Sequence, residues 1–190
     1  MGFFRKTNRT LESLTPANTP AARKVMDTLR SLEGRIDPNE VMLVGSAALV
    51  LHGVKLHSFD DPISGESGKN RPGDLDFTAT VEHMDALFAR GDFTLKDNRD
   101  SHNMQTVLRS DAQTVNELPV DVITRYQDGR HNPDRYDASL RKHIATARII
   151  GDTAFRIVSL QEAISSLQTS FNDPKAQLDL AAARRAQSTH

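Results

Sequence analysis

Three aspartates embedded in strand-like sequence constrain the fold of this chain more than any other feature. Asp74 and Asp76 open the alternating segment 74–80, and Asp121 stands within the apolar segment 119–123. Both segments have the residue pattern of β-strands. An ionised carboxylate on a buried strand is energetically costly unless it is paired or bound to a cation. We therefore expect the fold to bring the three carboxylates to one cation site.

The first two aspartates are separated by a single residue. Side chains alternate between the two faces of a strand, so Asp74 and Asp76 share one face while Leu75 and Phe77 share the other. Two carboxylates in this arrangement can hold one or two Mg2+ ions. The alternative interpretation is a turn aspartate followed by an exposed strand residue.

The third aspartate is flanked by valines. If Val120 and Val122 face the core, Asp121 shares the opposite face with Pro119 and Ile123. A third carboxylate beside a metal pair can bind a second ion and accept the proton of an attacking hydroxyl. A solvated strand face is the alternative interpretation.

A Gly45-Ser46 pair follows the apolar segment 41–44, which we predict to be a buried strand, and precedes a helix predicted over residues 47–52. The N-terminus of a helix offers unpaired N–H groups and the positive end of the helix dipole, both of which favour phosphate oxygens. Glycine permits close approach of the backbone, and serine adds a hydroxyl donor. The alternative is a simple strand-to-helix turn in which Ser46 caps the helix. Together with the aspartates, the pair indicates a site for a nucleoside triphosphate and Mg2+.

The composition excludes several classes of protein. The 190 residues suit one domain, or one domain with a small helical appendage, and the formal net charge of -1 excludes a global field that gathers nucleic acid. The absence of cysteine excludes disulfides and thiol chemistry. The N-terminal sequence lacks the apolar run of a signal peptide, and the apolar stretch 41–50 is too short to span a bilayer. We therefore expect a cytoplasmic protein without a membrane partner.

The remaining periodicity predicts an α/β (α+β) fold with a mixed sheet flanked by helices and a helical C-terminal part. We divide the chain into a polar, frayed N-terminal segment (1–18), a core (19–150) and a C-terminal helical subdomain (151–190). The predicted helices cover residues 20–33, 47–52, 81–90, 135–143, 160–170 and 174–185. The predicted strands cover residues 41–44, 74–80, 93–96, 104–109 and 118–124, with a hairpin formed by 146–150 and 154–158. The segments 55–73 and 125–136 are predicted to be loops.

Local signals predict how two of these helices begin and how a third is oriented. Thr19 followed by Pro20 is a strong helix start, and Ser159 with Glu162 fits a capping box. On the helix 81–90, we expect Met84, Leu87 and Phe88 to face inward.

With these residues in place, the chain resembles the nucleotidyltransferase superfamily typified by DNA polymerase beta. The signature of that superfamily is Gly-Ser or Gly-Gly at a helix start, Asp-x-Asp on the next strand and one Asp on a later strand. It is matched here by Gly45-Ser46, Asp74-x-Asp76 and Asp121.

Three further segments narrow the resemblance. The segment 41–53 (VMLVGSAALVLHG) is similar to the bacterial branch that contains the abortive-infection toxins of type IV toxin–antitoxin systems. The segment 158–163 (VSLQEA) is similar to a helix start of that branch, and 174–180 (PKAQLDL) is similar to its Lys-Asp-x-x-Asp segment through Lys175 and Asp179. The resemblance spans roughly residues 40–182.

The resemblance implies transfer of a nucleoside monophosphate from an NTP to an acceptor hydroxyl. Asp74 and Asp76 would hold two Mg2+ ions, for which Mn2+ is a substitute, and Asp121 would complete the ion that activates the acceptor. The acceptor would be tRNA or a protein, and an antitoxin protein would be a partner.

The same resemblance assigns nucleotide-binding roles. The N–H groups of the Gly45-Ser46 turn and the Ser46 hydroxyl would hold the β- and γ-phosphates, and Lys175 would neutralise phosphate charge. Arg71 would reach the cleft from the loop 55–73. For Arg71 and Lys175 the alternative is a solvated surface cation.

Two alternative functions stay open at this point. One is transfer to a small molecule such as an aminoglycoside or lincosamide antibiotic, which would favour an acidic cleft where tRNA would favour a basic rim. The other is a non-catalytic nucleotide-binding or interaction protein that keeps the fold. A locally basic stretch within 125–142 either contacts RNA backbone or is a solvated face.

Overall fold

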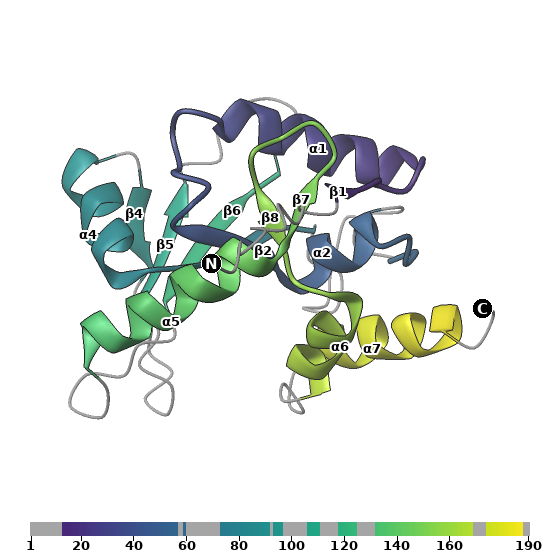
Figure 1. Cartoon of the computed structure of the whole chain (residues 1–190). Helices are drawn as coiled ribbons and strands as arrows, with labels where there is room; N and C mark the ends of the chain where they lie inside the picture. Colours follow the sequence, from purple (N-terminus) through teal and green to yellow (C-terminus); the bar gives the residue numbers. More distant parts are fainter. Residues whose placement is uncertain are drawn as a thin grey trace, which may run out of the picture.

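A computed structural model of the chain describes residues 13–56, 59, 73–91, 93–96, 106–110, 118–124, 132–168 and 174–187, and within them helices alternate with strands (Figure 1). The helices are α1 (Pro20–Leu32), α2 (Gly45–Leu51), α4 (Val81–Arg90), α5 (Pro133–Thr146), α6 (Leu160–Gln168) and α7 (Pro174–Gln187). The strands are β1 (Ser13–Leu14), β2 (Val41–Val44), β3 (Leu75–Ala79), β4 (Phe93–Lys96), β5 (Thr106–Ser110), β6 (Val120–Thr124), β7 (Arg148–Ile150) and β8 (Arg156–Ile157). The predicted α/β class is confirmed.

The described strands form one mixed sheet in the order β1-β7-β8-β2-β3-β6-β5-β4. At its centre, β3 runs antiparallel to β2 and parallel to β6. The strands β4 and β5, which lie between β3 and β6 in sequence, extend the sheet beyond β6 as antiparallel neighbours. This path leaves β3 and β6 side by side, and each of these two strands begins within two residues of a predicted site aspartate.

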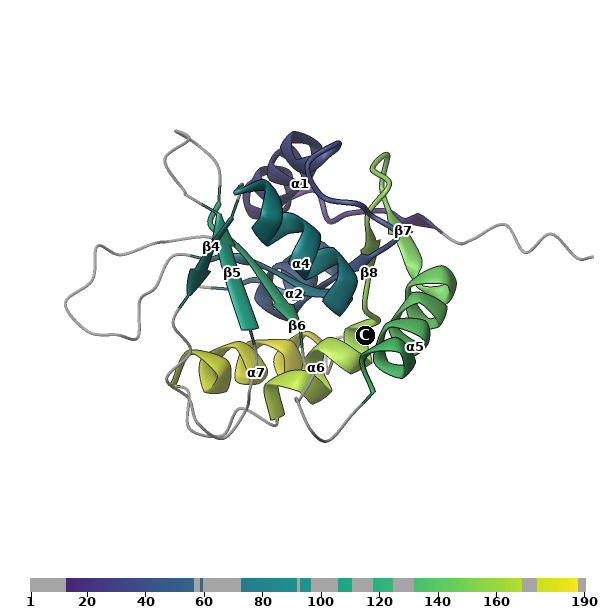
Figure 2. The same cartoon turned by 90° about the vertical axis from the view of Figure 1, so that its left-hand side faces the viewer.

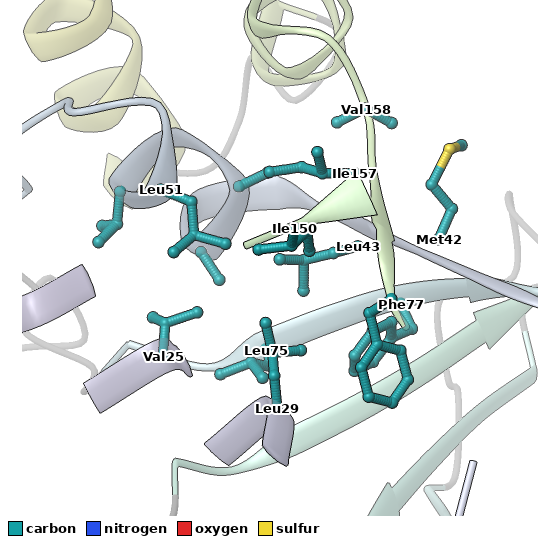
Figure 3. Close-up of a cluster of buried hydrophobic side chains, with 14 of the residues drawn as sticks. Val25, Leu29, Met42, Leu43, Leu51, Leu75, Phe77, Ile150, Ile157 and Val158 are labelled. Atoms are coloured by element: carbon teal, nitrogen blue, oxygen red, sulfur yellow. The ribbon is translucent and has the colours of Figure 1, made fainter. Parts of the chain in front are cut away.

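The two faces of the sheet carry different side chains. Leu75 and Phe77 of β3 are fully buried, and Figure 3 shows Leu75 near Val25 and Leu29 of α1. Figures 1 and 2 show α1 on one side of the sheet and α5, α6 and α7 on the other. The face of β3 that carries the aspartates is therefore turned away from α1 and toward the C-terminal helices.

The two predicted helix starts are formed by the expected residues. Thr19 accepts a hydrogen bond from the first turn of α1, and Pro20 is the first helical residue. Gly91 ends α4 in the left-handed conformation. At α6, the Ser159 N–H donates to the Glu162 carboxylate at 2.8 Å and the Glu162 N–H donates to the Ser159 hydroxyl at 3.2 Å, so the predicted capping box is confirmed.

Two local predictions were wrong. Ser13 and Leu14, expected to be frayed, form β1 and pair in parallel with β7. Phe88, expected to face inward, is 57% exposed, and His83 takes a buried position on α4 instead. The buried residues of α4 are therefore His83, Met84 and Leu87.

Two helix boundaries also differ from the prediction. The helix α2 begins at Gly45 itself, directly after β2, rather than at residue 47. The helix α5 begins at Pro133, because the side chain of Asn132 caps its first turn, and it extends to Thr146.

The C-terminal third of the chain is built onto the central sheet. The strands β7 and β8 form the predicted antiparallel hairpin, and β8 is also the parallel neighbour of β2. The helix α6 contacts both α2 and α7. Among the described residues, no helix is both long enough and apolar enough to cross a membrane.

Candidate metal centre

The structure brings the three sequence-predicted carboxylates together. Asp74, Asp76 and Asp121 each offer one carboxylate oxygen, and these three oxygens lie within 4.8 Å of one another. Asp76 and Asp121 are register partners on the parallel strands β3 and β6. Asp74 directly precedes β3 and lies two residues from Asp76, which places both side chains on the same face of the strand.

The apolar residues between the aspartates explain why the carboxylates converge. Leu75, Phe77, Val120 and Val122 are all buried, so the alternation of side chains turns the aspartates to the opposite face of the sheet. The Leu75 N–H donates to the Pro119 carbonyl at 2.8 Å, which fixes the register where the two strands begin. A shift of one residue would bury the carboxylates in the core and expose the apolar set.

The donor chemistry of the cluster suits a hard divalent cation. Asp121 is 5% exposed, whereas Asp74 and Asp76 are partly exposed and reach solvent. Three carboxylates this close repel one another, and a bound divalent cation offsets that repulsion. Carboxylate oxygens are the ligands that Mg2+ and Mn2+ prefer, and a cleft-facing pair of oxygens leaves room for water and substrate ligands. The three residues therefore fit the cation that the sequence predicts.

Gly45 lies directly against the cluster. Its neighbour Val44 is the register partner of Asp76, and the chain turns at Gly45 with a φ of 68°. A Cβ atom at position 45 would lie 2.6 Å from Oδ2 of Asp76, closer than real Cβ contacts allow. Both the positive φ and this contact require glycine. Gly45 therefore sets how closely the start of α2 approaches the carboxylates.

Ser46 has a structural partner that the site predictions did not include. Its hydroxyl donates to Oδ2 of Asp179 at 2.6 Å, and both side chains are only 4% exposed. This bond ties the first turn of α2 to α7. The one sequence signal for Asp179 is its place in the segment 174–180, and nothing in that segment names Ser46 as its partner.

The two predicted cations are described only in part. Arg71 lies outside the described residues. Lys175 belongs to the first turn of α7, where the backbone is described and the side chain is not. Their contribution to phosphate binding stays a prediction.

A pocket of 270 Å³ adjoins the cluster, and Gly45 forms part of its lining. At the pocket, Nε2 of His143 on α5 lies 3.0 Å from Oε1 of Glu162 on α6. Burial raises the pKa of Glu162, but the hydrogen bonds from Ser159 and the charge of His143 outweigh that effect and leave the pKa below its ordinary value. The carboxylate of Glu162 is therefore held ionised at the pocket wall. The sequence did not indicate this pair, because its members lie on different helices.

Comparison of the chain with protein-family models, with curated proteins and with solved structures finds no match. A proposal of function therefore starts from the residues, their geometry and the motifs in the sequence.

Proposed function

We propose that the chain is a Mg2+-dependent nucleotidyltransferase, which moves a nucleoside monophosphate from an NTP to an acceptor hydroxyl. The observation that carries the proposal is the meeting of Asp74, Asp76 and Asp121 within 4.8 Å, next to the turn at Gly45. NTP chemistry needs carboxylates that bind divalent cations and a backbone turn that binds phosphates at the start of a helix. Both parts lie side by side here.

In the proposed reaction, the acceptor oxygen attacks the α-phosphorus in line. A new P–O bond forms, the bond to the β-phosphate oxygen breaks, and pyrophosphate leaves. Mg2+ ions bound at the cluster would offset the charge that develops on the attacking and leaving oxygens. Asp74 and Asp76 would position the donor triphosphate, while Asp121, on the β6 side of the cluster, would face the acceptor and accept its proton.

The start of α2 supports phosphate binding through its backbone rather than through the serine hydroxyl. The Ser46 hydroxyl is donated to Asp179, so the groups that the turn directs toward a ligand are backbone N–H groups. Gly45 lets these groups approach a phosphate that is also bound near Asp76. We therefore place the β- and γ-phosphates at the backbone of this turn.

We extend the proposal to the acceptor and to the biological role. The similarity of 41–53, 158–163 and 174–180 to the toxin branch supports tRNA or a protein as acceptor and a toxin that a partner antitoxin neutralises. No contact between described residues distinguishes these acceptors from a small molecule, so the experiment below offers all three.

The test is a labelling assay with purified protein and Mg2+. Each of the four NTPs, labelled with 32P at the α-phosphate, is incubated with total cellular RNA, with cellular protein and with candidate antibiotics. We expect label to enter one acceptor class with the wild-type protein and not with the Asp74→Ala/Asp76→Ala double variant. Asp85→Asn, which removes an exposed carboxylate on α4, is the matched control and should label as the wild type does.

The position of the label separates the proposed reaction from its rivals. Nucleotidyl transfer moves the α-label and leaves a γ-label in pyrophosphate, whereas a kinase moves the γ-label. Transfer of the γ-label would replace the proposal by phosphoryl transfer. NTP binding without transfer to any acceptor would leave a non-catalytic nucleotide-binding protein.

A further inference from the structure

The pocket beside the aspartates has no role in the reaction described so far. We propose that it takes the base and ribose of the donor NTP, an inference that rests on the proposed nucleotidyl transfer. Four observations support it: the size of the pocket, its connection to Asp76, its position relative to Asp121 and the chemistry of its walls.

The pocket has the size of a small ligand. Its volume of 270 Å³ lies just below the usual range for small-molecule sites, which begins at about 300 Å³. A folded tRNA or a protein surface needs a wide, shallow interface instead. The volume thus suits one nucleoside rather than a broad macromolecular surface.

The pocket continues the face of the sheet that carries the metal ligands. Val44 is the register partner of Asp76, and Met42 is the register partner of Thr78. Directly opposed residues on antiparallel strands share a face, so the pocket residues Met42, Val44 and Thr78 lie on the same face as Asp76. Thr78 is two residues beyond Asp76, roughly 7 Å along the strand, which is the separation that a ribose spans between its phosphate and its base.

The position of the pocket favours the donor over the acceptor. The strand order β2-β3-β6 places Asp121 on one side of β3 and the pocket on the other. In the proposed reaction Asp121 faces the acceptor hydroxyl, and in-line attack requires the acceptor and the leaving pyrophosphate to lie on opposite sides of the α-phosphorus. The donor phosphates that we place at the Gly45 turn already lie on the β2 side, and the pocket, which Gly45 also lines, lies on that side too.

The walls of the pocket combine apolar surface with fixed polar groups. Met42 and Val158 present apolar surface, and Figure 3 shows Met42 on the opposite side of β2 from Leu43 of the core. Methionine packs well against flat rings because its thioether is flexible and polarizable. The carboxylate of Glu162 accepts hydrogen bonds, and the hydroxyl of Ser166 donates or accepts them. A base needs flat apolar surface for its faces and polar groups for its edge, and this pocket has both.

Two adjacent serines on α6 provide the test. Ser166 lines the pocket, whereas Ser165 is exposed on the same helix. Ser166→Phe fills the pocket, and Ser165→Phe is the matched control with the same change of composition. Equilibrium dialysis measures binding of each labelled NTP and of inorganic tripolyphosphate, both with Mg2+, to wild-type protein and both variants. Thermal unfolding verifies that each variant is folded, and Ser166→Leu with its control Ser165→Leu replaces any variant that is not.

We expect Ser166→Phe to weaken NTP binding by about tenfold or more, since a blocked site must displace the base or distort the pocket. Tripolyphosphate lacks a nucleoside, so its affinity should be unchanged, and Ser165→Phe should bind both ligands as the wild type does. The inference is overturned if Ser166→Phe binds NTP normally, even if it slows transfer, because the pocket would then belong to the acceptor. An equal loss of affinity for NTP and for tripolyphosphate in Ser166→Phe overturns it too, because the pocket would then not contribute specifically to binding of the nucleoside. A wild-type protein that binds neither ligand overturns the proposed function itself.

Discussion

The two faces of the segment 74–79 carry opposite kinds of side chain. On one face, Leu75 and Phe77 are fully buried, with Leu75 near α1 and Phe77 against the ring of Phe155. On the other face, Asp74 and Asp76 are partly exposed and lie within 4.8 Å of Asp121. One short stretch of backbone thus supplies both the centre of the hydrophobic core and the candidate metal centre.

This difference indicates how the carboxylates are held in place. Bringing like charges together costs free energy, whereas burying large apolar side chains is favourable. Alternation along the strand couples the two effects, because the register that buries Phe77 is the register that sets Asp76 beside Asp121. The core face therefore fixes the geometry of the face that carries the chemistry.

The largest effect is expected on the core face. Phe77→Ala should lower the free energy of unfolding by about 3–5 kcal/mol, because it leaves a cavity in a fully buried layer. Urea unfolding at pH 7 measures the change. Phe88→Ala is the matched control, since Phe88 is 57% exposed and its loss should change stability by no more than about 0.5 kcal/mol. Similar values for the two variants would show that the core face does not dominate stability.

The next effect concerns the polar face and depends on Mg2+. A cation that binds only the folded state stabilises it by about 2.7 kcal/mol at a concentration one hundred times its Kd. We expect Mg2+ to raise the thermal stability of the wild type and of Asp85→Asn. It should leave the thermal stability of Asp76→Asn unchanged, because Asp76 offers one of the three carboxylate ligands. Equal stabilisation of all three proteins would place the bound cation elsewhere.

The sequence predicted those features that depend on local pattern. The strand alternation placed Leu75 and Asp76 on opposite faces, and the pairs Thr19-Pro20 and Ser159-Glu162 begin their helices as expected. These signals work because a strand, a cap or a tight turn is decided within a few residues. The same reasoning identified the three aspartates, since each is conspicuous in its own apolar surroundings.

Features that depend on the path of the whole chain were not predicted. The hydrogen bond from Ser46 to Asp179 and the contact between His143 and Glu162 join helices that are far apart in sequence, so no local pattern reveals them. The exposure of Phe88 also depends on how the whole helix α4 is set against its neighbours. Sequence periodicity identifies the residues that are able to form a site, but their partners follow from tertiary packing.

A smaller effect tests the contact between the two parts of the candidate site. Gly45→Ala should lower stability by about 1–3 kcal/mol, because alanine is strained at φ 68° and its Cβ would meet Asp76. Gly34→Ala is the matched control, since Gly34 has a φ of 80° and no heavy atom within 4 Å of the added Cβ. The two variants share the backbone strain, so the difference between them isolates the contact with Asp76. We expect Gly45→Ala alone to weaken the Mg2+ effect on thermal unfolding; an equal response in both variants would separate Gly45 from the metal centre.

The smallest effect tests how the C-terminal helices are held over the polar face. Arg141 on α5 donates from Nε to Glu40 at 2.8 Å, and the Thr80 hydroxyl donates to the same carboxylate at 2.6 Å. Burial raises the pKa of Glu40, but these two hydrogen bonds and the charge of Arg141 outweigh it and leave the pKa below the ordinary value of 4.5. A carboxylate whose pKa is lower in the folded state stabilises the fold above the unfolded pKa, and that contribution is lost as the pH falls through the folded pKa.

Arg141→Met, which keeps an apolar stem, should therefore reduce stability at pH 7 by about 0.5–1 kcal/mol, because the pair is partly exposed. The deficit should shrink as the pH falls below 4.5, where Glu40 of the unfolded chain takes up a proton, until the pH passes the lower pKa of Glu40 in the folded wild type. Urea unfolding at a series of pH values measures it, and Arg135→Met, an exposed position on the same helix, should show no such trend. A deficit that stays constant with pH would mean that Arg141 acts through its apolar stem, and that the polar face, like the core face, is held mainly by packing.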